Sequence, residues 1–193
     1  PGSRVADIGT DHALLPRILL GEGHASFCIA TEVDRAALNR LKGRLGDRPL
    51  PDNLDLRAGD GLAPLKRADR LDVLVLAGMG AGPMVRILSS PRRLNLGPCL
   101  LVLQPQGDPA VLRRWLSGNG YRIQGERLQR IRSGFHLTLA AGQACGDPAP
   151  SHPILDVDDL MAAGPLLVRS GDPLVRMYWE RQLRRLLRLE RAG

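Results

Sequence analysis

The chain has 193 residues, 44% of them hydrophobic and 24% charged, which is enough for one well-buried domain with a smaller addition. Only 3% of the residues are aromatic, which argues against a surface of many stacked rings, and no apolar run reaches the roughly 18 residues that a membrane span needs. The formal net charge of +7 makes a polyanion the first class of partner to consider. We expect a cytoplasmic protein that does not bind membranes.

Cysteine and histidine are sparse, and neither shows the spacing of a metal site. Cys28, Cys99 and Cys145 include no C-x-x-C pair, and the four histidines form no ligand-spaced pair. We therefore expect buried thiols in a reducing compartment and no bound metal.

Runs rich in Val, Ile, Leu and Ala alternate with helical patterns along most of the chain. The predicted strands are residues 4–8, 27–33, 54–58, 71–76, 99–103, 122–128 and 135–141. The predicted helices between them are residues 12–20, 35–45, 83–89 and 109–119. Because most strand runs do not alternate with polar residues, they are typical of parallel strands covered on both faces. The order predicts a doubly wound α/β sheet.

The last two predicted strands follow each other through the turn "RSG", which predicts an antiparallel hairpin at one edge of the sheet. This is the arrangement of Rossmann-like class I methyltransferases. A Pro-rich stretch and a helical pattern come next. We divide the chain into a methyltransferase domain at residues 1–143, a linker at 144–153 and a C-terminal helical segment at 154–193.

Acidic residues and glycines follow four of the predicted strands at the point where each strand ends. The first strand ends in Asp7, Gly9, Asp11 and His12, the second in Glu32 and Val33, the third in Asp60 and Gly61, and the fourth in Ala77, Gly78 and Met79. Open parallel sheets bind their ligands at this edge, so we expect these residues to form a cofactor site.

The first of these turns argues against a dinucleotide. A dinucleotide loop needs G-x-G-x-x-G, whereas this turn has only Gly9 and places Asp11 where a diphosphate would approach. S-adenosylmethionine has a cationic end and a nucleoside end, and both suit carboxylates. Glu32 is expected to accept both ribose hydroxyls, and Asp60 the adenine amino group. Asp7 and Asp11 would face the positive charges, and Gly9 would leave room for the methionine chain.

Six segments, taken in order, resemble the bacterial tRNA (adenine(22)-N(1))-methyltransferase family. They are "VADIGTDHALLP", "ATEVD", "RAGDGLAPL", "LDVLVLAGMGAGPMVRIL", "LVLQPQGDPAVLRRWLSGNGYRI" and "AGPLLV". The resemblance implies a class I methyltransferase domain that uses S-adenosylmethionine, followed by a helical domain that helps to hold tRNA.

Adenine N1 has an in-plane lone pair, so its methylation needs alignment of the reacting atoms rather than a strong base. We expect Gln104 to hydrogen-bond the amino edge of the target base, with Pro105 stiffening the turn and Gln106 beside it. Asp11 would offset the charge of the product, and His12 would contact the methionine carboxylate. Two alternatives stay open: Gln104 is only a polar strand end, and the "AGMGAG" glycines only allow close helix packing.

Arginines are dense near the C-terminus, on a helical pattern that also carries an apolar stripe. We expect these to contact tRNA phosphates: Arg176, Arg181, Arg184, Arg185 and Arg188. A solvated helix whose arginines only add solubility is the alternative. For the chain as a whole, the rivals are a methyltransferase of another RNA or protein, and an RNA-binding module without turnover. We expect a monomer.

Overall fold

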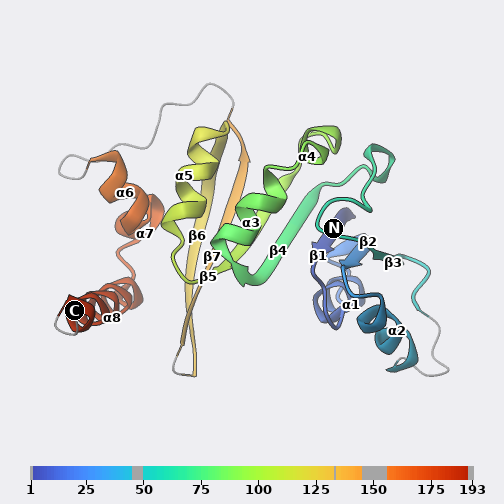
Figure 1. The fold of residues 1–193 in the computed structure, drawn as a ribbon, viewed down its shortest axis with the longest axis horizontal. Coiled ribbons are helices and arrows are strands. Elements are labelled where there is room, and N and C mark those ends of the chain that lie inside the picture. The colour runs from blue at the N-terminus through green and yellow to red at the C-terminus, as the bar shows by residue number, and fades with distance from the viewer. Residues whose placement is uncertain (1, 45–49, 133, 145–155, 191–193) are drawn as a thin grey trace.

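The computed structural model describes residues 2–44, 50–132, 134–144 and 156–190. Its centre is a seven-stranded sheet with the order β3-β2-β1-β4-β5-β7-β6 (Figure 1). The strands are β1 (Ser3–Ile8), β2 (Ala25–Glu32), β3 (Leu54–Ala58), β4 (Val73–Gly80), β5 (Leu100–Gln106), β6 (Tyr121–Ile131) and β7 (Gly134–Gln143). All seven predicted strands are present.

The first five strands run parallel, and β7 pairs antiparallel with both β5 and β6. The predicted mostly parallel sheet with an antiparallel hairpin at one edge is therefore confirmed. Strand runs without alternation are buried on both sides, as in β1, where Val5, Ala6 and Ile8 are each at most 5% exposed.

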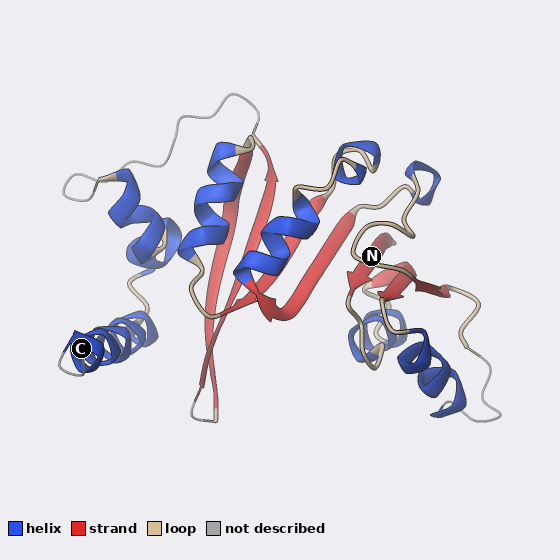
Figure 2. Ribbon diagram, in the orientation of Figure 1, coloured by secondary structure: helices blue, strands red, loops and turns tan. Residues whose placement is uncertain are grey.

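Helices cover the two faces of the sheet, and successive residues of one strand face different helices. The helices are α1 (Leu14–Gly21), α2 (Arg35–Arg44), α3 (Ala81–Leu88), α4 (Arg92–Asn95) and α5 (Ala110–Gly118), with a short 3-10 helix η1 (Arg67–Asp69). Val5 packs in a cluster with Leu41 of α2, whereas Ala6 packs in a cluster with Met84 of α3 and Leu112 of α5. The sheet thus has a helical layer on each side (Figure 2).

The C-terminal segment is helical and lies beyond β6 at the edge of the sheet (Figure 1). It contains α6 (Val157–Ala163), α7 (Pro165–Ser170) and α8 (Pro173–Glu190). Leu167, Val175 and Tyr178 belong to the same buried cluster as the α3 and α5 face of the sheet. Of the predicted linker, only Ala144 lies within the described residues.

Several predicted boundaries differ from the observed ones by one to four residues, and two of these differences have a clear local reason. Helix α1 begins at Leu14 rather than at residue 12, because Asp11 and Ala13 both have left-handed backbone angles, φ 46°. Strand β4 continues to Gly80 because its end still pairs with β5, up to Gln106. The short helices η1 and α4 were not predicted.

Burial of the cysteines agrees with the expectation where it can be followed. Cys28 and Cys99 are buried and free, and burial raises the pKa of the Cys28 thiol to about 11. Cys145 lies outside the described residues. No helix within the described ranges is long and apolar enough to cross a bilayer.

Candidate functional site

Backbone hydrogen bonds join the turns that follow the first three strands. Gly9 N and Thr10 N both donate to the carbonyl of Thr31 at 2.9 Å, and Gly59 N donates to the carbonyl of Glu32 at 2.9 Å. The predicted cofactor residues of these turns therefore lie along one continuous edge, the carboxyl edge of the sheet.

Asp7 is the buried carboxylate of this edge. It is 7% exposed, and the Thr10 hydroxyl donates to its Oδ2 at 2.7 Å. Burial raises the pKa of Asp7 above its ordinary value, and the Thr10 hydrogen bond only partly opposes this effect. Burying the ionised carboxylate of Asp7 costs free energy unless a cation lies beside it. The site therefore favours a ligand with a positive charge near Asp7.

Glu32 is half-buried and is held by backbone groups from two turns. Its Oε2 accepts from Asp11 N at 3.2 Å, and its Oε1 accepts from Asp34 N at 3.1 Å. A carboxylate has about four acceptor positions, so each oxygen can take one further hydrogen bond. The carboxylate is thus fixed in place with acceptor capacity left for a ligand.

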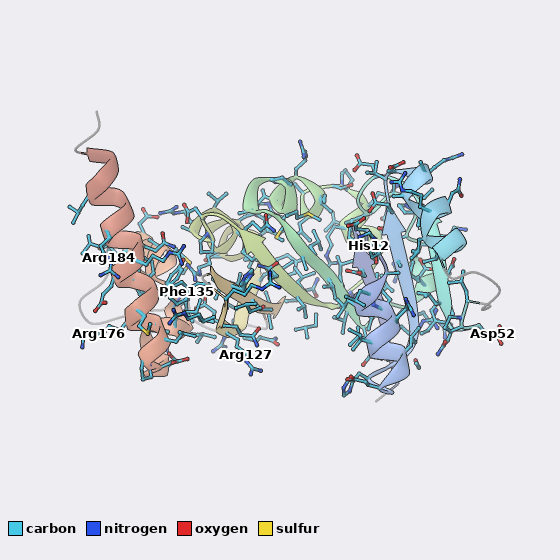
Figure 3. All side chains as sticks on the ribbon, turned by 90° about the horizontal axis from the view of Figure 1, so that it is seen from below. His12, Asp52, Arg127, Phe135, Arg176 and Arg184 are labelled. Carbon is cyan, nitrogen blue, oxygen red and sulfur yellow. The ribbon has the colours of Figure 1, made fainter. Side chains whose placement is uncertain are left out.

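The remaining predicted residues of these turns are open to solvent. Val33 is 65% exposed, although its side chain is apolar, and Asp60 is exposed beside Gly61, which has φ 51°. Asp11 and His12 are exposed as well, with 3.3 Å between Oδ2 of Asp11 and Nε2 of His12 (Figure 3). An exposed apolar side chain between acidic residues suits a ligand with an aromatic ring and hydroxyl groups.

Gly9 connects this edge to the end of β4. Its φ is 74°, and a Cβ added there would lie 3.3 Å from Cε of Met79. A side chain at this position would be strained and would push against Met79, so the close approach of the two turns requires glycine. The predicted residues after β1 and β4 therefore meet.

The end of β4 contains a bulge at Gly78, opposite Gln104 of β5. Pairing shifts between Ala77 and Met79, Gly78 has φ 75°, and Gly78 N donates to Oε1 of Gln104 at 2.9 Å. Nothing lies within 4 Å of a Cβ added at Gly78, so its backbone angle rather than close helix packing requires glycine there. Gln104 thus holds the bulge through its amide oxygen, and its amide nitrogen remains a further donor group.

A cavity of about 490 Å³ begins at the "LQPQG" turn. Its wall continues over the β6–β7 hairpin to α8, which the sequence prediction did not connect with the turn. It is lined by Gln104, Pro105, Gln106, Gly107, Pro109, Gly134, Phe135, His136, Leu137, Tyr178, Arg181 and Gln182. The structure therefore brings the predicted substrate residues of β5 and one predicted arginine of α8 to a single cavity.

The predicted arginines of α8 divide into groups. Arg181 lies at the cavity with its guanidinium 5.7 Å from the centre of the Phe135 ring, whereas Arg176 forms an exposed ion pair with Glu180 at 3.1 Å. Arg184 is exposed on α8 (Figure 3). The side chains of Arg185 and Arg188 lie outside what the structure describes.

The hairpin of β6 and β7 carries arginines that the sequence prediction missed. Pairing of β5 with β7 is recorded from Leu101 to Leu103, but pairing of β6 with β7 continues to Ile131, so the hairpin extends beyond the carboxyl edge (Figure 1). Its exposed arginines are Arg127, Arg130 and Arg132. Three arginines within six residues at the "RSG" turn could have indicated a phosphate-binding surface. The sequence alone did not show that this turn lies beside the cofactor edge.

Metal ligands do not gather at this edge or elsewhere in the described residues. Among residues 2–44, 50–132, 134–144 and 156–190, no group of three or more His, Cys, Asp or Glu side chains is placed to hold a metal ion.

Known proteins match this chain over nearly its whole length. A family model described as tRNA (adenine(22)-N(1))-methyltransferase matches residues 5–192. The Bacillus subtilis (strain 168) protein of that name is 28% identical over 182 residues, which are 94% of this chain and 75% of that protein. The crystal structure of the B. subtilis m1A22 tRNA methyltransferase is similar with a TM-score of 0.85 and 27% identity, covering 97% of this chain and 79% of that one. Streptococcus pneumoniae Sp1610, solved in complex with S-adenosylmethionine, gives a TM-score of 0.82 and 26% identity, covering 96% and 83% of the two chains. Because the family model spans nearly the whole sequence, this chain belongs to the tRNA (adenine(22)-N(1))-methyltransferase family.

Proposed function

We propose that this protein transfers the methyl group of S-adenosylmethionine to N1 of an adenine in the D-arm region of tRNA, adenine 22 by its family. The observation that carries the proposal is the continuity of the acidic edge with the cavity: Gly9 approaches Met79, and Met79 pairs with Pro105, which lines the cavity. The acidic edge suits a cationic nucleoside ligand, and the cavity opens beside the arginines of α8 and of the β6–β7 hairpin. A cytoplasmic monomer remains our prediction.

The cofactor fits the chemistry of the edge. Asp7 is a buried carboxylate whose charge calls for a cation, which the ammonium or sulfonium group supplies. Glu32 has free acceptor positions for the ribose hydroxyls, and the exposed Val33 is suited to pack on the adenine ring. Gly9, Gly61, Ala77, Gly78 and Met79 form the backbone floor, and Asp60 accepts from the adenine amino group.

The reaction needs alignment more than acid–base chemistry. When bound, the cofactor supplies an electrophilic methyl group: the N1 lone pair forms the new N–C bond, and the C–S bond breaks with its electrons going to sulfur. Gln104 orients the target base with its amide, held in place by Gly78 N. Pro105 is buried and stiffens the turn, and the exposed carboxylate of Asp11 offsets the charge on the methylated ring.

Phosphate contacts supply affinity from two elements. The exposed Arg184 of α8 and the hairpin arginines flank the cavity that contains Arg181. Such contacts add affinity without reading sequence, so recognition of one adenine depends on the shape of the tRNA and on the cavity.

Replacing Asp7 by Asn should change stability and cofactor affinity in opposite directions. The Asn oxygen can still accept from Thr10, and the variant has no buried charge, so the cofactor-free protein should be more stable at neutral pH. Since the folded-state pKa of Asp7 is raised, the gain should vanish as the pH falls below its ordinary value near 3.8. S-adenosylmethionine affinity should fall by about tenfold. Urea unfolding across pH and calorimetry measure the two effects; a less stable variant at neutral pH would contradict the assignment.

Replacing Glu32 by Gln should weaken S-adenosylmethionine binding by about tenfold, because one charged acceptor of the ribose hydroxyls is lost. Asp34→Asn is the matched control, since it removes the same charge two residues away and Asn still caps α2 by accepting from Ala36 N. Calorimetry compares both variants with the wild type. Equal affinities for the two variants would exclude Glu32 from the site.

Purified protein should form 1-methyladenosine in unmodified tRNA, detected by mass spectrometry of nuclease digests, and EDTA should not reduce turnover. Gln104→Ala should lower kcat by about tenfold or more while S-adenosylmethionine affinity stays near that of the wild type. Gln124→Ala, at an exposed residue of β6 outside the lining of the cavity, is the control and should have little effect. Methyl label on protein, or loss of turnover in EDTA, would disprove the proposed reaction.

Removing an arginine that contacts phosphate should flatten the salt dependence of tRNA binding. We expect Arg127→Ala and Arg184→Ala each to reduce the slope of log affinity against log salt by about one. Arg92→Ala is the control, because Arg92 is exposed on α4, at the opposite edge from the hairpin tip (Figure 1). Filter binding at several KCl concentrations gives the slopes. Point variants are preferable to deletion of residues 174–193, which would take Val175 and Tyr178 from the core.

A further inference from the structure

The segment "AGPLLV", residues 163–168, has no role in the site described above, yet its backbone is unusually constrained. Gly164 has φ 92°, and a Cβ added there would lie 2.6 Å from Nη2 and 3.0 Å from Cζ of Arg113. Pro165 is the first residue of α7, a position where its fixed φ and missing N–H are tolerated. The segment is therefore shaped to turn sharply against one buried arginine.

Arg113, on α5, holds the end of α6. Its side chain is fully buried, and Nη1 donates to the carbonyls of Met161 at 3.0 Å and Ala162 at 3.1 Å. Carbonyls at a helix C-terminus lack partners within the helix, and a positive charge there is favourable. Nε of Arg113 donates to Oε1 of Glu126 at 2.7 Å, and both side chains of this pair are fully buried.

Glu126, on β6, holds the start of α7. Arg113 donates to helix carbonyls, whereas the negatively charged Glu126 accepts from helix amides. Its Oε2 accepts from Leu166 N at 2.8 Å and from Leu167 N at 3.2 Å. These amides are in the first turn of α7, where an acceptor with negative charge is favourable. One ion pair thus satisfies the facing ends of two successive helices.

The position of α7 decides where α8 begins. Only Gly171 and Asp172 separate the two helices, and Val175 and Tyr178 of α8 are then buried in the core. Tyr178 meets Phe135 edge to face with 5.6 Å between ring centres, and both residues line the cavity at Gln104. The cavity wall that carries Arg181 is part of α8, and α8 is connected to the ion pair through α7 and the two residues between these helices.

We propose that Arg113 and Glu126 are positioning residues for the RNA substrate: they fix α8 against the cavity, and "AGPLLV" is the segment shaped to receive them. This inference rests on the proposed function, since it assigns the cavity wall to tRNA. Apolar packing is non-directional and would let the helices slide, whereas two hydrogen bonds to the end of α6 and two to the start of α7 fix their positions.

The test replaces the pair by apolar residues of similar size, Arg113→Met with Glu126→Leu, so that no unpaired charge is left buried. Hydrogen exchange of α8 amides should accelerate. The KM for tRNA should rise about tenfold if the docked state falls to about one tenth of the population. S-adenosylmethionine affinity, and kcat at saturating tRNA, should stay close to those of the wild type.

The matched control is Arg114→Gln with Asp158→Asn. This neighbouring pair also joins α5 to α6, at 3.0 Å, but it is exposed, so both measurements should stay near wild type. A purely structural role would instead lower cofactor affinity and kcat together with the amount of folded protein.

Gly164→Ala is a second route to the same result, because its Cβ would push into Arg113 while both charges remain. It should also raise the KM for tRNA more than it changes cofactor affinity. Unchanged α8 exchange in both variants, or faster exchange with an unchanged KM for tRNA, would overturn the inference. If the wild type does not methylate tRNA, the proposed function fails, and the exchange measurement still distinguishes that failure from failure of the ion pair to hold α8.

Discussion

Parallel pairing of β2, β1, β4 and β5 sends the turn after each of these strands to the same edge of the sheet. That geometric constraint brings together residues as distant in sequence as Gly9 and Gln104, with Met79 between them. The apolar parts of these strands form the core, and the chemistry lies in their last residues and in the turns that follow. The proposed cofactor site consists of the ends of β1 to β4, and the proposed substrate site begins at the end of β5.

Burial alone does not decide the charge state of an acidic residue in this sheet. Asp7 and Asp69 are both 7% exposed, yet the pKa of Asp7 is raised and that of Asp69 is lowered. Burial acts on both, but Arg57 donates to the two oxygens of Asp69 at 2.7 and 2.8 Å, and Lys66 N donates as well. Within the part of the chain that the structure describes, the side chain of Asp7 accepts only from the Thr10 hydroxyl. This difference supports our proposal that the partner of Asp7 is a ligand, whereas the partner of Asp69 is protein.

Local pattern was enough to predict the sheet, because most strand runs are apolar on both faces and the predicted helices at residues 12–20, 35–45, 83–89 and 109–119 fall between two runs. The strand at 54–58 was predicted with its observed bounds. Contacts between residues far apart in the sequence could not be predicted. Arg113 and Arg114 are adjacent and look alike in the sequence, but the first has a fully buried side chain and the side chain of the second is 47% exposed. Which of them is buried depends on Glu126 and on helices more than forty residues away.

The same limit applies to the candidate site. Predicted residues after β1, β2 and β4 were brought together because topology alone places them at one edge. The cavity was not predicted, because its far wall comes from the hairpin and from α8, whose positions depend on side-chain packing. The left-handed angles of Asp11 and Ala13 were also missed, since neither residue type requires them.

The strand order also has a consequence for how the chain assembles. Among the described strands β6 pairs with β7 alone, and β7 lies between β5 and β6. Since only residues 132 and 133 separate the two strands, their hairpin is a local structure that can close early, whereas β7 must find β5 across a long chain segment. Glu126 reaches its place together with that hairpin and Arg113 with α5, so the ends of α6 and α7 find their partners only when both elements have packed. Because the proposed cofactor edge ends at Met79 whereas the cavity also needs α8, synthesis completes the segments of the first before those of the second.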